Sequence, residues 1–345
     1  MIQTAFIGDA VLVEPLVAQL KESLPEARID ILVRPQAAEL FETHPAVHAV
    51  LVYDKRGRDR GLSGFRRILT RLRSQGYDLI LVPHRSIRSA LLARLSRSSC
   101  RIGFETSTGK WLFSIRVPYE PVHEVIRNLK LLTPLGLDAG YRNPKIYPTT
   151  EEYERVTPIL QGSKAVVRVA LAPGSIWATK RWPETSYIEL ARQIKREIDA
   201  AFFILGSRED RVLGETLARS IGADAVNLCG RLTLRESVAL LSQCDVLISN
   251  DSAPTHLGVA AGCRVVTIFG PTVPAFGFYP FGSEHRVVEP EVHLSCRPCG
   301  IHGGRKCPIG THECMLSIRP ERVAALILNM VNEEAARQSA IVQQE

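Results

Sequence analysis

Residues 245–274 read DVLISNDSAPTHLGVAAGCRVVTIFGPTVP and hold a complete β-α-β unit. An apolar run typical of a buried strand, 246–249, stops at the polar group Asn250-Asp251-Ser252. A helix of small residues follows over about 254–261, and a second apolar strand covers 265–269. Strands joined through a helix pair in parallel, so this segment predicts an α/β fold built on a parallel sheet.

Polar residues follow both strands of this unit at the same edge of the sheet. Ligands of open parallel sheets bind beyond the carboxyl ends of the strands, where Asp251, Ser252 and the turn Gly270-Pro271-Thr272 lie. Asp251 and Ser252 also precede a helix, whose unpaired N–H groups and dipole favour an anion. The pattern favours a ligand site. The alternative is that one of these two side chains only caps the helix.

Strand patterns alternate with helical patterns in both halves of the chain. The other predicted strands are 3–7, 29–33, 47–53, 78–82, 167–172, 201–205 and 225–228. A stretch rich in Gly, Pro and Tyr, 138–150, has no clear periodicity and leads into an interdomain linker. We therefore predict two Rossmann-like parallel-sheet domains, 1–150 and 151–319, which face each other across a cleft and precede a helix in 320–345.

Length and composition are those of a globular protein with two domains. The chain has 345 residues, of which 45% are hydrophobic and 23% are charged. The first apolar run contains Asp9 and lacks a basic leader, so we expect a buried strand there and no signal peptide. Residues 265–283 are uncharged, but Pro271, Pro274 and Pro280 would break a membrane-spanning helix.

Positive charge is concentrated in the first half of the chain. Residues 1–150 hold 22 Lys and Arg against 14 Asp and Glu, while the formal net charge of the whole chain is +7. Residues 55–101 alone carry 13 basic and two acidic side chains. Such a surface attracts phosphorylated sugars, anionic lipids or nucleic acids. The alternative is a solvated basic face without a ligand.

Asp9 lies where the first predicted strand meets a helix predicted over about 10–23. The dinucleotide fingerprint G-x-G-x-x-G is absent from this turn. A carboxylate at the carboxyl end of a strand is suited to act as a general base toward a hydroxyl group. The alternative is that Asp9 caps the helix, although no Glu or Gln stands three residues further on to complete a capping box.

The first strand-to-helix loop of the second half, 172–183, reads APGSIWATKRWP. Ser175 and Thr179 place small hydroxyl groups beside the cations Lys180 and Arg181. This set is suited to binding a diphosphate and to stabilising the negative charge of a leaving group. The spacing of a Walker loop is missing. The alternative is that Lys180 and Arg181 are only exposed surface residues.

Four cysteines stand close together near the end of the chain, at Cys296, Cys299, Cys307 and Cys314. Four thiols in a short loop could bind zinc, and His302 and His312 lie among them. The spacing is not that of a common zinc ribbon or finger, and other cysteines of the chain stand in apolar runs as small hydrophobic residues. We expect no metal, with zinc at this cluster as the alternative.

Several segments in this order resemble the heptosyltransferase family of lipopolysaccharide core biosynthesis, and most of all its type II enzymes. The segments are IGDAVLVEPLVAQL (7–20), PGSIWATKRWP (173–183), LTLRESVALLSQCDVLISNDSAPTHLGVAAG (232–262), VVTIFGPT (265–272) and the cysteine loop with PERV (320–323). The resemblance implies a GT-B fold, ADP-heptose as donor substrate, inverting transfer to a hydroxyl group of the inner core, and no obligatory metal or other cofactor. It also implies that the helix in 320–345 crosses back to the first domain.

The resemblance further implies roles for particular residues. Asp9 matches the catalytic base and Lys180 matches the cation that meets the donor diphosphate. The implied donor-binding residues are Ser175, Thr179, Lys180, Asp251, Ser252, Ala253 and His256. Ala253 and Pro254 depart from the family pattern, which has Gly and an apolar residue there, so backbone contacts to the donor are in doubt at this point.

The implied acceptor is an anionic glycolipid, heptosyl-Kdo2-lipid A, which carries carboxylates and phosphates. Lys55, Arg56, Arg85 and Arg88 are the basic residues expected to bind it. Because this acceptor is embedded in a membrane, we expect a cytoplasmic protein that associates peripherally with the inner leaflet. In that compartment the eight cysteines of the chain stay reduced.

Three alternatives stay open on the sequence. Another nucleotide-sugar transferase of the same family would use a different acceptor, such as that of the third heptose. A non-catalytic protein that binds anionic lipid or another polyanion would use only the basic half. Few aromatic residues are interleaved in 55–101, which argues against a nucleic-acid partner, and the missing glycine fingerprint argues against a nicotinamide oxidoreductase.

Overall fold

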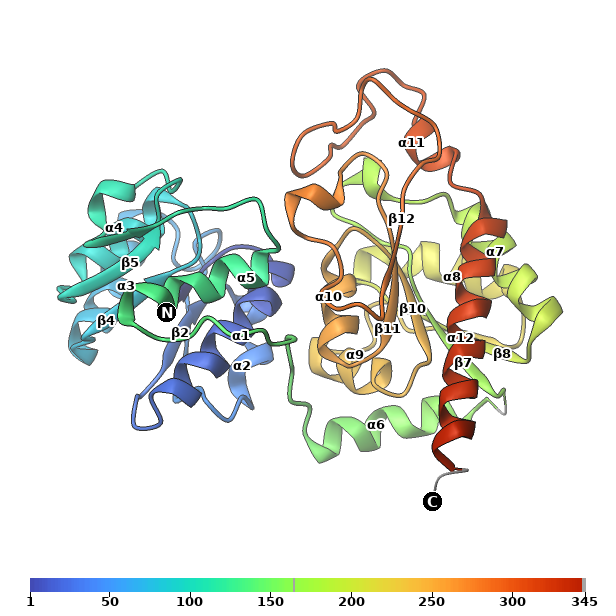
Figure 1. Ribbon diagram of the computed structural model, residues 1–345, viewed down its shortest axis with the longest axis horizontal. Coiled ribbons are helices and arrows are strands. Elements are labelled where there is room, and N and C mark those ends of the chain that lie inside the picture. Colours follow the sequence, from blue (N-terminus) through green and yellow to red (C-terminus); the bar gives the residue numbers. More distant parts are fainter. Residues whose placement is uncertain (164, 343–345) are drawn as a thin grey trace. The chain divides into compact units, whose positions relative to one another are not determined.

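The structure is a computed structural model that describes residues 1–163 and 165–342, with side chains up to Glu333. The chain divides into two compact units, Met1–Tyr147 and Pro148–Glu345 (Figure 1). Each unit has parallel strands with helices between them, as the alternating sequence pattern predicts. Within the described residues, no helix has the length and apolar character that a membrane crossing requires.

Unit 1, Met1–Tyr147, contains two parallel ladders of three strands. Their orders are β1-β2-β3 and β4-β5-β6, and β1 also contacts β4, so the ladders meet at these two strands. The strands are β1 (Ile2–Gln3), β2 (Asp30–Val33), β3 (Ala49–Val52), β4 (Leu79–Val82), β5 (Cys100–Phe104) and β6 (Ile115–Val117). The α-helices and 3₁₀-helices are α1 (Ile7–Ser23), η1 (Pro35–Ala37), α2 (Glu39–Glu42), α3 (Gly61–Gln75), α4 (Ile87–Leu95), η2 (Lys110–Leu112), α5 (Glu124–Leu129) and η3 (Lys130–Leu135).

Unit 2, Pro148–Glu345, contains one parallel sheet of six strands in the order β12-β11-β10-β7-β8-β9. The strands are β7 (Val167–Ala172), β8 (Ala200–Ile204), β9 (Ala225–Asn227), β10 (Val246–Asn250), β11 (Arg264–Ile268) and β12 (Arg286–Val288). The helices are α6 (Thr150–Gln161), η4 (Ala178–Lys180), α7 (Glu184–Glu197), η5 (Arg208–Asp210), α8 (Arg211–Ile221), α9 (Leu234–Leu241), α10 (Ala253–Ala260), η6 (Pro274–Phe276), α11 (Glu313–Leu316) and α12 (Pro320–Val342).

The strand order of unit 2 reverses direction between β7 and β10. From β7 the chain proceeds to β8 and β9 on one side, and then crosses over to β10, β11 and β12 on the other. Two neighbouring strands whose following helices lead away from each other leave room at their carboxyl ends, which is where ligands of doubly wound sheets bind. The order β3-β2-β1 followed by β4-β5-β6 places a corresponding point in unit 1 at the ends of β1 and β4.

The first helix begins earlier than the sequence predicts. We expected a strand over 3–7 and a helix from about Ala10, whereas β1 is Ile2–Gln3 and α1 begins at Ile7. The Asp9 carboxylate accepts a hydrogen bond from the Phe6 backbone N–H at 3.1 Å, which satisfies an amide at the helix start. Asp9 therefore stands in the first turn of α1. Capping of this helix, which we considered as the alternative role of Asp9, is provided by the Asp9 carboxylate through its bond with the Phe6 N–H.

The last helix packs on unit 2. α12 runs along α7, and Val323, Ala324 and Ile327 join the core that β7, β8 and β10 form with α7 (Figure 1). The contacts described for the side chains of α12, up to Glu333, are thus with the core of unit 2. The crossing of this helix to the first domain, which the family resemblance implies, stays a prediction.

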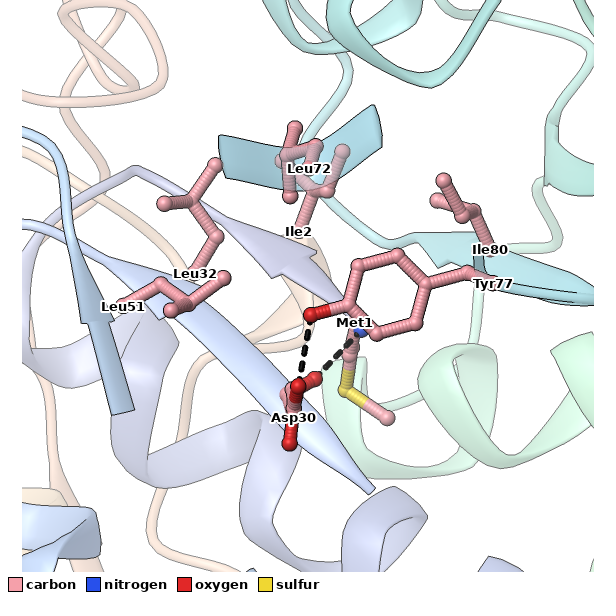
Figure 2. Close-up of a pocket in the computed structure, with 8 residues that line it drawn as sticks. All are labelled: Met1, Ile2, Asp30, Leu32, Leu51, Leu72, Tyr77 and Ile80. Atoms are coloured by element: carbon pink, nitrogen blue, oxygen red, sulfur yellow. Dashed lines mark hydrogen bonds between the residues drawn. The ribbon is translucent and has the colours of Figure 1, made fainter. Parts of the chain in front are cut away.

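A small cavity lies in unit 1 at the amino ends of its strands (Figure 2). The Met1 amino group donates to the Asp30 backbone carbonyl at 2.7 Å, and the Tyr77 hydroxyl donates to the Asp30 carboxylate at 2.6 Å. Burial lowers the pKa of the Met1 amino group to about 6. This edge of the sheet is opposite to the carboxyl ends of the strands, so the cavity is a structural feature and not part of the predicted site.

A buried contact between the His44 ring and the Glu14 carboxylate makes a testable contribution to the stability of unit 1. His44 and Glu14 are both buried and lie 2.9 Å apart, and the second Glu14 oxygen accepts the Lys145 N–H at 2.8 Å. His44→Ala leaves a buried carboxylate without its main partner and should lower the free energy of unfolding by about 3 kcal/mol in urea titrations. The matched change His48→Ala removes an exposed partner of Asp30 and should cost less than about 1 kcal/mol. Equal losses in the two variants would contradict this assignment.

Candidate active site

The site in unit 2 is built from the loops that follow the two neighbouring strands β7 and β10. The loop after β7, residues 173–183, carries Lys180, and we call it the Lys180 loop. The turn after β10 carries Asp251 and Ser252 and leads into α10. Because β7 and β10 are hydrogen-bonded neighbours, side chains 71 residues apart in sequence meet at one edge of the sheet.

Lys180 and Asp251 form a buried ion pair. The Lys180 ammonium lies 2.5 Å from a carboxylate oxygen of Asp251 and also donates to its backbone carbonyl at 3.2 Å. Each residue is only 8% exposed. The Thr272 hydroxyl, in the turn after β11, donates to the same carboxylate oxygen at 2.6 Å. The ammonium has three N–H groups, and its contacts with residues 1–163 and 165–342 are the two with Asp251, which leaves one N–H for a ligand.

Asn250 fixes the two ends of the Lys180 loop. Its side-chain amide donates to the Pro173 carbonyl at 2.8 Å, and its side-chain oxygen accepts the Trp182 N–H at 3.0 Å. Asn250 is fully buried. Sequence reasoning noted it only as part of a polar group, and missed this role. The signal available was a polar amide at the last position of an otherwise apolar buried strand.

The N-terminus of α10 lies directly beside the ion pair. Ser252 occupies the N-cap position, but its hydroxyl donates to the Asn250 carbonyl at 3.3 Å and accepts no bond from the helix. The helix begins at Ala253, and Pro254 has no N–H group to satisfy. Ser252 therefore caps this helix by its backbone position alone, and the electropositive end of the helix dipole faces the sheet edge that Lys180 occupies.

The remaining residues predicted to bind the donor have contacts inside unit 2. The Ser175 hydroxyl accepts the Trp177 N–H at 3.3 Å. The Thr179 hydroxyl donates to the Gly304 carbonyl at 3.0 Å and accepts the Gly304 N–H at 2.8 Å. His256 is 4% exposed, within α10. Lys180 and Asp251 thus contact each other directly, and Ser252 and Ala253 follow Asp251 in the chain, while the Thr179 hydroxyl bonds to Gly304 and His256 is buried within α10.

Asp9 in unit 1 is a partly exposed carboxylate with an unusual pKa. Burial by the surrounding protein, followed by the charge of Glu124, raises the pKa of Asp9 to about 6, while the Phe6 N–H and Arg85 act in the opposite direction. A carboxylate of this kind is ionised at neutral pH and is more basic than a solvated one. These are the properties that a general base requires.

Basic side chains gather at the carboxyl ends of β2, β3 and β4 in unit 1. Burial lowers the pKa of Lys55 to about 8, and Arg34, Arg88 and Arg56 contribute to the same shift. Lys55 donates to the Thr4 carbonyl, after β1, at 2.7 Å. Several positive charges thus surround the Lys55 ammonium. The cluster is therefore suited to bind an anion.

Two further residues line this edge of unit 1. The Thr4 hydroxyl lies 3.0 Å from the His84 ring, and burial lowers the pKa of His84 to about 4, so this imidazole is neutral at physiological pH. The Arg85 guanidinium lies 4.1 Å from the centre of the Tyr119 ring, which orients it. The sequence predicted Lys55, Arg56, Arg85 and Arg88; Arg34, Thr4 and His84 were missed because their positions become adjacent only through the strand order.

The four late cysteines are free thiols. In residues 1–163 and 165–342, no group of three or more His, Cys, Asp or Glu side chains is arranged to hold a metal ion. Backbone N–H groups, chiefly that of His312, lower the pKa of the Cys307 thiol, and burial raises the pKa of Cys314 to about 11.

Comparison with known proteins gives a consistent result. The model of glycosyltransferase family 9 (heptosyltransferase) matches residues 65–302, which is more than half of the chain. The lipooligosaccharide heptosyltransferase 2 of Campylobacter jejuni is 23% identical over 330 residues, which cover 94% of this chain and 96% of that protein. The lipopolysaccharide heptosyltransferase 2 of Salmonella typhimurium is 24% identical over 353 residues, covering 97% and 98%. A lipopolysaccharide heptosyltransferase 3 of Escherichia coli is 24% identical over 277 residues, covering 77% and 82%.

Solved structures show the same fold. The glycosyl transferase family 9 protein of Veillonella parvula superposes with a TM-score of 0.85 at 20% identity, covering 96% of both chains. The ADP-heptose lps heptosyltransferase II of E. coli superposes with a TM-score of 0.76 at 23% identity, covering 96% of this chain and 98% of that one. The predictions of a GT-B fold and of a glycosyltransferase are confirmed. The chain belongs to glycosyltransferase family 9, and it is a heptosyl-transferring enzyme.

Proposed function

We propose that this enzyme transfers heptose from ADP-heptose to a hydroxyl group of the lipopolysaccharide inner core, with inversion at the anomeric carbon. The proposed acceptor is heptosyl-Kdo2-lipid A, the substrate of a type II enzyme. The observation that carries the proposal is the Lys180–Asp251 pair at the N-terminus of α10, at the point where the strand order of unit 2 reverses. This is where an anionic nucleotide-sugar donor is expected to bind.

The donor half of the mechanism depends on charge stabilisation in unit 2. When the bond between the anomeric carbon and the phosphate oxygen breaks, its electron pair stays with ADP. Lys180 and the N-terminal amides of α10 then meet the new negative charge on the diphosphate. Asp251 holds the Lys180 ammonium in place through the 2.5 Å contact, so little reorganisation is needed when that charge develops.

The acceptor half of the mechanism assigns general-base catalysis to Asp9. The acceptor oxygen attacks the anomeric carbon from the face opposite to the diphosphate, and its proton passes to the Asp9 carboxylate. A pKa of about 6 keeps Asp9 ionised at neutral pH and allows it to accept this proton as the bond forms. The heptoside product and ADP leave, and Asp9 returns its proton to water.

The proposed acceptor site is the basic edge of unit 1. Lys55, Arg56, Arg85 and Arg88 are proposed to bind the carboxylates and phosphates of the glycolipid, with Arg34 beside them. Because the proposed acceptor is anchored in a lipid bilayer, we propose a cytoplasmic enzyme that visits the anionic inner leaflet through this basic surface.

Two other functions remain as outcomes of experiment. Transfer to a different core acceptor, such as that of the third heptose, is supported by the relatives named heptosyltransferase 3. A non-catalytic polyanion binder would show salt-dependent binding without any requirement for a nucleotide sugar. Turnover assays with ADP-heptose and a panel of truncated core acceptors separate all three.

Asp9→Asn is expected to abolish transfer while leaving donor binding intact. The amide still accepts the Phe6 N–H, so α1 keeps its start, but it cannot take a proton. The turnover number kcat should fall by about 10²–10⁴-fold with the Kd for ADP unchanged by calorimetry. In the wild-type enzyme, kcat/KM should decline below about pH 6 as Asp9 is protonated. Turnover of the variant at a rate near wild type would remove Asp9 from the mechanism.

The same substitution is expected to stabilise the protein at neutral pH. The Asp9 carboxyl loses its proton near pH 3.8 when unfolded and near pH 6 when folded, so the folded state binds more protons between these values and its stability falls as the pH rises. Asp9→Asn removes this penalty, which is on the order of 1–3 kcal/mol above pH 6. Urea unfolding at pH 7.5 should show the gain, and unfolding at pH 4 should show little of it.

Acceptor binding is expected to weaken above pH 8. Lys55 is charged below its pKa of about 8 and becomes neutral above it, so its attraction for an anionic acceptor is lost as the pH rises. The KM for the acceptor should rise between pH 7.5 and 9 while the KM for the donor stays constant. Lys55→Arg keeps the charge in this range and should abolish the rise. A rise of the same size in the Arg variant would assign the effect to another group.

A further inference from the structure

The segment with the four late cysteines, residues 296–314, has no role in the proposed chemistry. We call it the cysteine segment. Two of its internal contacts involve cysteine sulfur: the Cys299 thiol donates to the Cys296 carbonyl at 3.2 Å, and the Cys307 sulfur accepts the His312 N–H at 3.4 Å. These contacts tighten the turns of the segment. Other residues of the segment contact the site of unit 2, and Arg297 also pairs with Glu289 at 2.5 Å.

The cysteine segment holds Thr179, the residue directly before Lys180. The Thr179 backbone N–H donates to the Gly304 carbonyl at 3.1 Å, and the Thr179 hydroxyl exchanges two further hydrogen bonds with the backbone of Gly304. The His312 ring lies 2.8 Å from the Thr179 carbonyl. Every polar group of Thr179 is therefore bonded to the cysteine segment.

The segment also packs against the Lys180 side chain. A Cβ atom built on Gly303 would lie 3.3 Å and 3.6 Å from two carbons of the Lys180 stem, and 3.0 Å from the Thr179 hydroxyl oxygen. Gly303 has a φ of +75°, which glycine adopts without strain. The absence of a side chain at Gly303 thus lets the segment approach the stem whose ammonium contacts Asp251.

The start of the cysteine segment contacts the turn 270–272, which supports Asp251. The Arg297 guanidinium donates to the carbonyl groups of Gly270 at 2.6 Å and Thr272 at 2.8 Å. The Cys299 N–H donates to the Pro271 carbonyl at 2.8 Å. This turn supplies the Thr272 hydroxyl that bonds to Asp251, so the segment contacts both partners of the pair through their immediate supports.

We propose that the cysteine segment is a clamp that sets Lys180 against Asp251 for the donor diphosphate, with Gly303 and His312 as positioning residues. The proposal rests on the proposed function for the identity of the ligand. The clamp itself rests on the contacts just described. The two parts are tested by different measurements on the full-length protein.

Gly303→Ala and Gly310→Ala are a matched pair of variants. Both residues have a left-handed φ, +75° and +78°, so alanine introduces similar backbone strain at both. The new Cβ atom at 303 meets Thr179 and Lys180, whereas the one at 310 has no atom within 4 Å. His312→Asn is a third variant, because asparagine tolerates the left-handed backbone of His312 (φ +53°) but cannot reach the Thr179 carbonyl as the ring does.

The first measurement is amide hydrogen exchange over residues 175–182 without any ligand. The second is the Kd for ADP by calorimetry, and the third separates kcat from the KM for the donor. We expect Gly303→Ala and His312→Asn to accelerate exchange about tenfold and to raise the Kd for ADP by a similar factor. Gly310→Ala should stay within about twofold of wild type in both, with all three variants folded by circular dichroism.

The outcomes distinguish the clamp from the proposed function. Equal effects of Gly303→Ala and Gly310→Ala, or no acceleration in His312→Asn, would overturn the clamp. Faster exchange with an unchanged Kd for ADP would overturn its link to the donor. If the wild-type protein does not bind ADP, the proposed donor fails, and the exchange experiment alone decides whether the cysteine segment positions Lys180.

Discussion

The buried pair of Lys180 and Asp251 is the interaction on which the site of unit 2 depends. Lys180 and Asp251 are residues that are each 8% exposed, and either charged group without the other would remain as an uncompensated buried charge. The pair therefore requires that the Lys180 loop and the turn after β10 are both held in fixed positions. Asn250 fixes the ends of one loop, Thr272 supports the carboxylate of the other, and the cysteine segment contacts the supports of both.

Strand order is what allows this meeting. β7 and β10 are separated in sequence by two strands, three α-helices and two 3₁₀-helices, but they are direct neighbours in the sheet. Since both strands are parallel, their carboxyl ends reach the same edge, and the chain leaves them toward opposite sides. Unit 1 repeats the arrangement with β1 and β4, which is why Thr4 and His84 lie within hydrogen-bonding distance there. The same strand arrangement thus places polar residues at one sheet edge in each unit. In unit 2 a basic and an acidic side chain are paired there, and in unit 1 the edge is strongly basic.

The sequence predicted the architecture well because the relevant signals are local. Apolar strands, small-residue helices and the polar turn at 250–252 lie within one window of residues. Contacts between distant loops could not be read in this way, so the pairing of Lys180 with Asp251 and the engagement of Thr179 by Gly304 emerged only from the fold. Two signals were available and unused: Thr149 and Glu152 form a capping box at the start of α6, and Asp9 satisfies the Phe6 N–H, which starts α1 a turn early.

The environments of Asp9 and Asp251 explain why the proposal assigns them different tasks. The Oδ2 atom of Asp251 accepts hydrogen bonds from the Lys180 ammonium and the Thr272 hydroxyl, so the Asp251 carboxylate is paired with Lys180. Asp9 accepts the Phe6 backbone N–H, lies near the charge of Glu124, and has a pKa of about 6. Two carboxylates whose surroundings differ in this way are suited to different steps: one orients a cation, and the other exchanges a proton near neutral pH. In the proposed mechanism, the same chemical group thus supports the leaving group in one unit and the nucleophile in the other.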